Sequence, residues 1–125
     1  MNWLLLDPAS VERIHDNVLN PGELPGRARD KSLESALARV DNRRAYGVIG
    51  DIFDLAAAYA VAIARGHCFN DGNKRTAYRV MYVCLDINGI EPDWPMPEAG
   101  DTIIRVAQGA LDEGDLAEWL RARAP

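Results

Sequence analysis

An alanine-rich apolar run from Leu55 to Ala64 sets narrow limits on the fold of this chain, since six of its ten residues are alanine. Asp51 ahead of the run is suited to cap a helix. Gly66 after it is suited to end one in the left-handed conformation. Small side chains on several faces let neighbouring helices approach closely. The sequence therefore predicts a central helix over residues 51–66, packed on several sides.

Apolar residues recur with helical spacing along nearly the whole chain. Asp7-Pro8 is a typical helix start, and Gly89 is a typical stop. No stretch alternates like a strand, apart from a possible short extended piece at Trp3 to Leu6. The expected helices cover about residues 8–20, 32–46, 51–66, 72–88, 98–109 and 114 onward. The pattern predicts an all-α fold of six helices in a single domain, residues 1–125.

Residues 20–29 form the main irregular segment. They hold two turn signals, Pro21-Gly22 and Pro25-Gly26, four residues apart. Such a segment can fold back as a flap with short extended arms, or it can be a plain surface connection. Spacing alone does not separate these two interpretations.

Charge and cysteine content exclude several classes of protein. Lys and Arg number 14 against 19 Asp and Glu, a formal net charge of −5. This balance disfavours direct binding to duplex DNA, so contact with DNA is expected only through another chain. Two cysteines are too few for a disulfide scaffold and indicate a reducing compartment.

The apolar stretches are far short of the ~20 residues of a membrane helix, and no signal-peptide pattern is visible, so a cytoplasmic location is expected.

Residues 66–76 join two predicted central helices and carry the densest polar chemistry. Asn70-Asp71-Gly72-Asn73 is typical of a turn into a helix N-terminus, where free N–H groups and the helix dipole favour an anion. The glycine lets a ligand approach the backbone. Lys74 and Arg75 follow in the first turn, where each cation costs roughly 0.3–1 kcal/mol. A bound phosphate would reverse that cost. The alternative is that both side chains point to solvent or pair with an acidic neighbour.

His67 and Asp71 flank this predicted anion site. His67 can accept a proton from an attacking hydroxyl near neutral pH. Asp71 can hold Mg²⁺, which usually accompanies nucleotide phosphates through one or two carboxylates. Phe69 is expected to anchor the loop by burying its ring. For Cys68, packing is favoured over nucleophilic chemistry because no base is evident beside it. His15 is expected to be a buried structural histidine.

This segment resembles the core motif of the Fic/Doc (Fido) superfamily: His, any, Phe, any, Asp, Gly, Asn, then two more residues ending in Arg. The matching residues, at the family's spacing, are His67, Phe69, Asp71, Gly72, Asn73 and Arg75. Similarity to the Doc (death-on-curing) toxins extends to Ile14-His15-Asp16, Leu24-Pro25-Gly26 and the run from Ala62 to Arg75. The resemblance implies a compact six-helix bundle with a flap after the first helix.

Two positions depart from the broader Fic pattern. That pattern has Gly where this chain has Lys74, and a second Arg where it has Tyr78, with Arg79 one place late. Fic enzymes with that Gly and Arg mostly transfer AMP, whereas Doc, with Lys, acts as a kinase. The resemblance therefore implies that ATP binds in the reversed orientation, with its γ-phosphate in the anion site.

The resemblance also implies a role for each motif residue. His67 would be the general base, Asp71 the Mg²⁺ ligand and Asn73 a phosphate-positioning residue. The residues implied to bind phosphate are Gly72, Asn73, Lys74 and Arg75, with Arg65 as a further candidate that could instead face solvent or form an ion pair. The flap residues implied to dock a target peptide as an added strand are Gly22, Leu24, Pro25 and Gly26. Positioning and charge stabilisation would carry such catalysis.

Three functions remain open at the level of sequence. The first is a Doc-type toxin that transfers the γ-phosphate of ATP to a Thr or Ser hydroxyl of elongation factor Tu and blocks translation. Its partner would be a Phd-like or similar antitoxin whose helical tail covers the active-site groove. The second is Fic-type nucleotidyl transfer (AMPylation) to a protein hydroxyl. The third is a non-catalytic, antitoxin-binding co-repressor.

Overall fold

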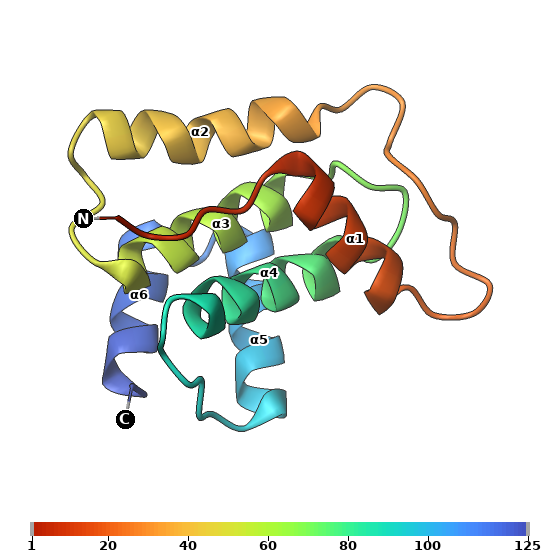
Figure 1. Ribbon diagram of the computed structural model, residues 1–125. Helices are drawn as coiled ribbons and strands as arrows, with labels where there is room; N and C mark the ends of the chain where they lie inside the picture. Colours follow the sequence, from red (N-terminus) through yellow and green to blue (C-terminus); the bar gives the residue numbers. More distant parts are fainter. Residues whose placement is uncertain (1, 125) are drawn as a thin grey trace.

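The computed structural model describes residues 2–124, and it is built from six α-helices (Figure 1). In chain order they are α1 (Pro8–Val18), α2 (Leu33–Ala45), α3 (Ile52–Gly66), α4 (Asn73–Ile87), α5 (Met96–Ala107) and α6 (Glu113–Ala122). Residues 2–124 contain no β-strand, although one isolated antiparallel bridge joins Arg27 to Phe69. The all-α prediction is confirmed.

Helix α3 occupies the centre of the bundle, as its alanine run predicts. It contacts α2, α4, α5 and α6, and Figure 1 shows these helices grouped around it. Leu55, Ala57 and Ala60 are completely buried. Because alanine adds so little bulk, helices on different sides of α3 can all pack close to its backbone. This arrangement fixes the end of α3 against the start of α4, where the candidate site lies.

Four helices begin where an oxygen-bearing side chain caps the first turn. The capping residues, whose side chains accept a backbone N–H, are Asp7, Ser32, Asp51 and Asp112. Three predicted boundaries were wrong by two residues. α1 ends at Val18 rather than near residue 20, and α5 spans Met96–Ala107 rather than residues 98–109. In α5 a proline within the first helical positions favours the earlier start, since its missing N–H costs nothing there.

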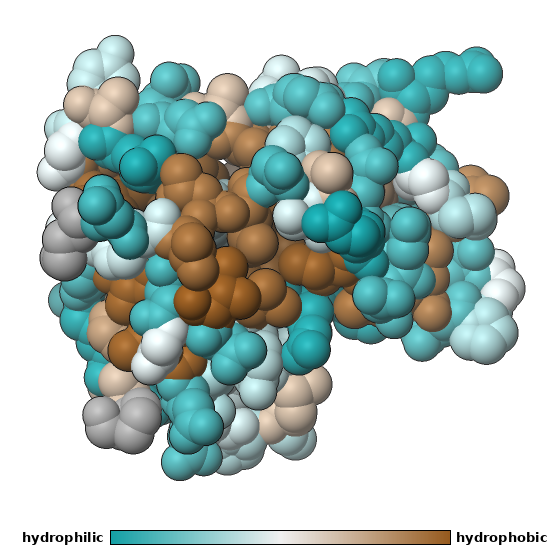
Figure 2. Space-filling view, in the orientation of Figure 1, coloured by the Kyte–Doolittle hydropathy of each residue, from teal (hydrophilic) through white to brown (hydrophobic). Residues whose placement is uncertain are grey.

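The N-terminal segment before α1 is extended but pairs with side chains rather than with a strand. The backbone N–H of Leu4 donates to Oδ1 of Asn88 at 2.8 Å, and Nδ2 of Asn88 donates to the carbonyl of Leu4 at 3.0 Å. Figure 2 shows apolar side chains gathered over this segment and α4. Leu5, Val83 and Ile87 are among those lining a groove of about 550 Å³ there. Within residues 2–124, no helix has both the length and the apolar character needed to cross a membrane.

Candidate active site

His67 leaves the end of α3 in the left-handed conformation, with φ of +49°. The sequence predicted this conformation for Gly66, and that prediction is wrong, because Gly66 is the last helical residue. The glycine serves a close approach instead. A Cβ at that position would lie 3.0 Å from Sγ of Cys68 and 3.5 Å from Cβ of Ala36. The sharp turn after α3 leaves the side chain of His67 exposed.

Phe69 anchors the loop between α3 and α4, as predicted. Its side chain is buried, and its ring stacks on His15 with the ring centroids 3.8 Å apart. Nε2 of His15 lies 2.7 Å from the carbonyl oxygen of Asp71, a contact in which the imidazole acts as donor. His15 is itself buried. Its predicted role as a buried structural histidine is confirmed.

The side chain of Asn73 holds the same loop from the first turn of α4. Its Oδ1 accepts the N–H of Phe69 at 3.0 Å, and its Nδ2 donates to the carbonyl of Phe69 at 2.9 Å. Both polar groups of the amide are therefore engaged with one backbone residue. The structure gives Asn73 a part in shaping the loop, beside the phosphate contact predicted for it.

Residues 20–29 pack along this loop, which supports the flap interpretation (Figure 1). The N–H of Ala28 donates to the carbonyl of Cys68 at 2.8 Å, and the N–H of Asn70 donates to the carbonyl of Gly26 at 3.1 Å. These two bonds form the antiparallel bridge between Arg27 and Phe69, the single bridge within residues 2–124. The flap thus presents a short extended arm next to the motif.

Asp71 also faces the flap. Its Oδ2 accepts the backbone N–H of Leu24 at 2.7 Å, and no partner for Oδ1 is present among residues 2–124. Within the described part of the chain, no three His, Cys, Asp or Glu side chains gather as a metal cluster. A metal at this position would therefore depend on one carboxylate together with ligand oxygens and water. That donor set suits Mg²⁺ bound with a nucleotide.

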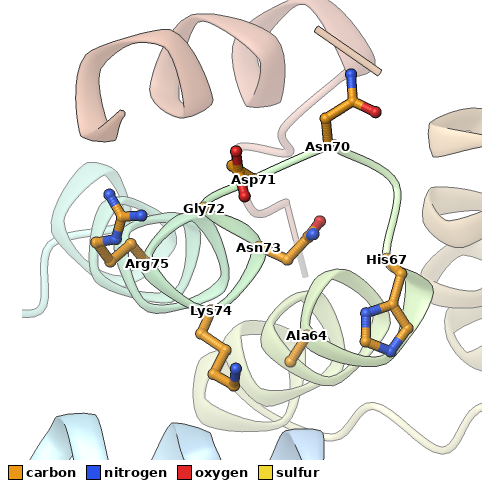
Figure 3. Close-up of a pocket in the computed structure, with 8 residues that line it drawn as sticks. All are labelled: Ala64, His67, Asn70, Asp71, Gly72, Asn73, Lys74 and Arg75. Carbon is orange, nitrogen blue, oxygen red and sulfur yellow. The ribbon is translucent and has the colours of Figure 1, made fainter. Parts of the chain in front are cut away.

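The start of α4 is open to an anion. Gly72 is the N-cap, with φ of +78° and no side chain capping the first turn, so the N–H groups there remain available. A pocket of about 350 Å³ lies in front of them, and the residues lining it are Ala64, His67, Asn70, Asp71, Gly72, Asn73, Lys74 and Arg75. Figure 3 shows His67 and Lys74 on either side of Ala64. Apart from Ala64, the pocket is therefore lined by polar residues and one glycine.

Arg75 follows the alternative left open by the sequence, in which it pairs with an acidic neighbour. In Figure 3 its guanidinium points away from His67. It donates to the carbonyl of Val18 at 2.6 Å and forms an ion pair with Glu23 of the flap. The hydrogen bond from Arg75 lowers the pKa of Glu23. Sequence reasoning missed Glu23, although a lone acid between two Pro-Gly turns was a signal that could have identified it.

Arg65 lies outside the pocket. Its Nε donates to the carbonyl of Val106 at 3.1 Å, and a second nitrogen donates to the carbonyl of Leu111 at 2.6 Å. The structure therefore does not bring Arg65 to the predicted phosphate site, which corrects the sequence-based assignment. Its guanidinium instead ties the end of α3 to the last turn of α5 and to the connection between α5 and α6.

Cys68 has the packing role favoured by its sequence context. It is buried, and its Sγ contacts the carbonyl oxygen of Ser32 at 3.7 Å. Burial raises the pKa of the Cys68 thiol, which opposes formation of a nucleophilic thiolate.

Comparison with known proteins places the same region in a recognised group. The profile of the Fic/DOC family matches residues 5–85, which include the flap and the whole motif. The chain is 38% identical over 117 residues to the "Protein kinase doc" of Escherichia phage P1, covering 93% of this chain and 92% of that protein. It is 35% identical over 103 residues to the "Toxin Doc" of Mycolicibacterium smegmatis, covering 79% and 78% respectively.

Proposed function

The chain belongs to the Fic/Doc family, and we propose that it is a Doc-type toxin that phosphorylates a protein hydroxyl with ATP. The observation that carries the proposal is the shared pocket. An exposed imidazole, a carboxylate, an uncapped helix N-terminus and a lysine all line one cavity. Each of these groups suits one part of phosphoryl transfer. In this reaction the protein mainly positions the reactants and stabilises charge, and it takes little part in covalent chemistry.

In this proposal the imidazole of His67 takes the proton of a Thr or Ser hydroxyl. The hydroxyl oxygen then bonds to the γ-phosphorus, the bond from that phosphorus to the β,γ-bridging oxygen breaks, and ADP leaves. The N–H groups of the first turn of α4 and the ammonium of Lys74 stabilise charge on the transferred group. Asp71 would hold Mg²⁺ together with phosphate oxygens, and the ion would neutralise part of the phosphate charge.

Lys74 supports transfer of the γ-phosphate over transfer of AMP. A glycine at this position would leave room for the phosphate tail of a nucleotide that presents its α-phosphorus. Lys74 instead fills part of that space and adds a cation on the pocket wall. The relative from phage P1 carries the name of a kinase, which agrees with this preference.

The flap is proposed to dock the protein substrate. Its residues near the turn, Gly22, Leu24, Pro25 and Gly26, lie beside the motif, and Leu24 is 58% exposed. An extended target segment could pair with this arm as an added strand and bring its hydroxyl to His67. We propose cytoplasmic elongation factor Tu as that substrate, with arrest of translation as the result.

The proposed partner is an antitoxin, Phd-like or similar, that covers the active-site groove. The names of the two relatives, a kinase and a toxin, support this context. Direct DNA binding is not part of the proposal, because the chain carries a net charge of −5.

A transfer assay with purified substrate and with cell extract, read together with growth after expression of wild type or His67→Ala, separates the three candidate functions. The full chain is incubated with elongation factor Tu, Mg²⁺ and ATP labelled at either the α or the γ phosphate, and His67→Ala is treated in parallel. The expected result is label from the γ position only, a mass gain of about 80 Da on the substrate, and no transfer by the variant.

Label from the α position, with a gain of about 329 Da, would replace the kinase with the AMPylation alternative. No transfer to any cellular protein, together with equal growth arrest by wild type and His67→Ala, would favour the non-catalytic co-repressor.

A further inference from the structure

A second cavity, of about 90 Å³, lies between α2, α3 and α6. Its lining residues are Arg39, Val40, Arg43, Ala58, Val61, Ala62, Arg65 and Glu113. The α3 residues among them are spaced three and four apart, so they form one stripe of that helix. Ala64 and His67, which line the active-site pocket, fall outside this stripe. The two cavities therefore open on different faces of α3.

Three arginines are among the residues that line this second cavity, and the guanidinium of one of them is rigidly held. The carbonyls of Val106 and Leu111 accept from Nε and one terminal nitrogen of Arg65, which fixes its plane. The other terminal nitrogen of Arg65 makes no hydrogen bond within residues 2–124. A cation whose orientation is already fixed loses little conformational entropy when it binds a ligand.

The other two arginines are short of partners. Nε of Arg43 is buried and has no hydrogen-bond partner within residues 2–124, an arrangement that costs free energy. Arg39 makes no hydrogen bond or ion pair with any residue in 2–124. The single carboxylate in the lining belongs to Glu113, and it lies 3.7 Å from a terminal nitrogen of Arg43. Glu113 pairs with Arg43 alone, so within this lining one carboxylate faces three arginines.

Small side chains leave the space that these cations face. Ala58 and Ala62 form part of the floor, where larger residues would fill the cavity. Its volume suits a tetrahedral oxyanion and is too small for a nucleotide. Arginine donors in more than one direction match the several oxygens of such an ion.

We propose that this cavity is a binding site for a phosphate group, with Arg39, Arg43 and Arg65 as its ligands. The bound group would bridge α2 and α3 beside the first turn of α6. The site does not depend on phosphoryl transfer at His67, because the lining shares no residue with the active-site pocket.

Titration of inorganic phosphate into the full chain, followed by calorimetry without nucleotide or Mg²⁺, tests the proposal. All proteins carry Lys74→Ala, so that binding in the active-site pocket is weakened. We expect saturable binding that Arg39→Gln weakens about ten-fold. Arg105→Gln removes an equal charge from an exposed position on α5 and should leave the affinity unchanged. Circular dichroism confirms that each variant is folded.

A second arm with phosphoserine distinguishes the source of the group. Binding of both compounds would identify a site open to phosphorylated molecules, and binding of phosphate alone would identify a site for the free ion. Absence of saturable phosphate binding, or equal affinities for Arg39→Gln and Arg105→Gln, would overturn the proposal.

Discussion

His67 occupies a backbone conformation that favours glycine. Its φ of +49° places a side chain with a Cβ in the left-handed region, which costs an L-residue roughly 1–2 kcal/mol. The neighbouring Gly66 does not relieve this cost, because it remains helical. Strain of this kind tends to be kept where a side chain is needed at a particular place. The conformation of His67 is thus consistent with a catalytic task.

Replacement of His67 by Gly should therefore stabilise the fold relative to His67→Ala. Both variants lack the imidazole, so both should lose the proposed phosphoryl transfer. The free energy of unfolding of the glycine variant should exceed that of the alanine variant by about 1 kcal/mol. This difference is the cost of the left-handed conformation for alanine, reduced by the greater entropy that glycine gives the unfolded chain. Urea denaturation of the two variants measures the difference. An alanine variant as stable as the glycine variant would show that this turn carries no strain.

Two neighbouring flap residues engage two charged residues of the motif, Arg75 and Asp71. Glu23 pairs with Arg75, and the N–H of Leu24 binds Oδ2 of Asp71. A nucleotide phosphate bound as the family resemblance implies would compete with the carboxylate of Glu23 for the guanidinium. Under the proposed function, these two flap contacts would oppose nucleotide binding.

Glu23→Gln should tighten binding of Mg²⁺-ATP by roughly two- to five-fold, the range set by a partly exposed ion pair. The neutral amide keeps the side-chain size but loses the charge that holds Arg75. Glu12→Gln is the matched control, because Glu12 pairs with Arg27 and neither residue lines the pocket. Calorimetric titration with ATP gives both affinities. Weaker binding by Glu23→Gln would mean that Glu23 orients Arg75 for the nucleotide.

At the scale of single elements, α3 shows how composition sets packing. Ala60 is completely buried at the centre of the bundle, where helices crowd around α3. Added methyl and methylene groups at this point have no cavity to enter, since interiors are packed to crystal-like density.

Ala60→Leu should destabilise the protein by about 1–3 kcal/mol through overpacking, although leucine is a good helix former. Ala38→Leu makes the same change on an exposed position of α2 and should shift stability by less than about 0.5 kcal/mol. Thermal and urea unfolding of both variants test this contrast. Equal stabilities would indicate that α3 can move away from its neighbours at little cost.

Across the whole molecule, local signals predicted the helices better than the side-chain contacts. The cap at Asp51 and the alanine run fixed α3, because a helix start and its apolar faces are encoded within a few residues. The His67-to-Arg75 motif likewise identified the pocket lining. Gly66 misled the prediction, since a glycine can serve close packing as well as a left-handed turn.

Contacts between distant segments could not be read from local pattern. Arg65 and Arg75 are both cations beside the motif, yet one reaches the carbonyl of Leu111 and the other reaches Glu23. Their partners are 46 and 52 residues away in the chain. Only the packing of whole helices decides which of these groups meet.

Several carboxylates that join separate elements have lowered pKa values. Hydrogen bonds from Arg75 lower the pKa of Glu23, and those from Arg27 lower the pKa of Glu34. For Asp51, burial raises the pKa, but hydrogen bonds, chiefly from Arg121, outweigh it and the net pKa is lowered. These pairs connect the flap to α4 and α2, and α6 to the start of α3.

Acidic pH should therefore destabilise the folded chain. A carboxylate with a depressed pKa stabilises the fold above its unfolded-state pKa of about 4, and loses that contribution as the pH falls through its lower folded-state value. The free energy of unfolding should stay nearly level from pH 7 to pH 5 and decline below about pH 4. Urea denaturation across this range measures the decline. Asp51→Asn should lower stability at pH 7 and flatten the decline, because its amide cannot titrate. If the free energy of unfolding of Asp51→Asn fell as steeply below pH 4 as that of wild type, the ion pair between α3 and α6 would not be the source of the pH sensitivity.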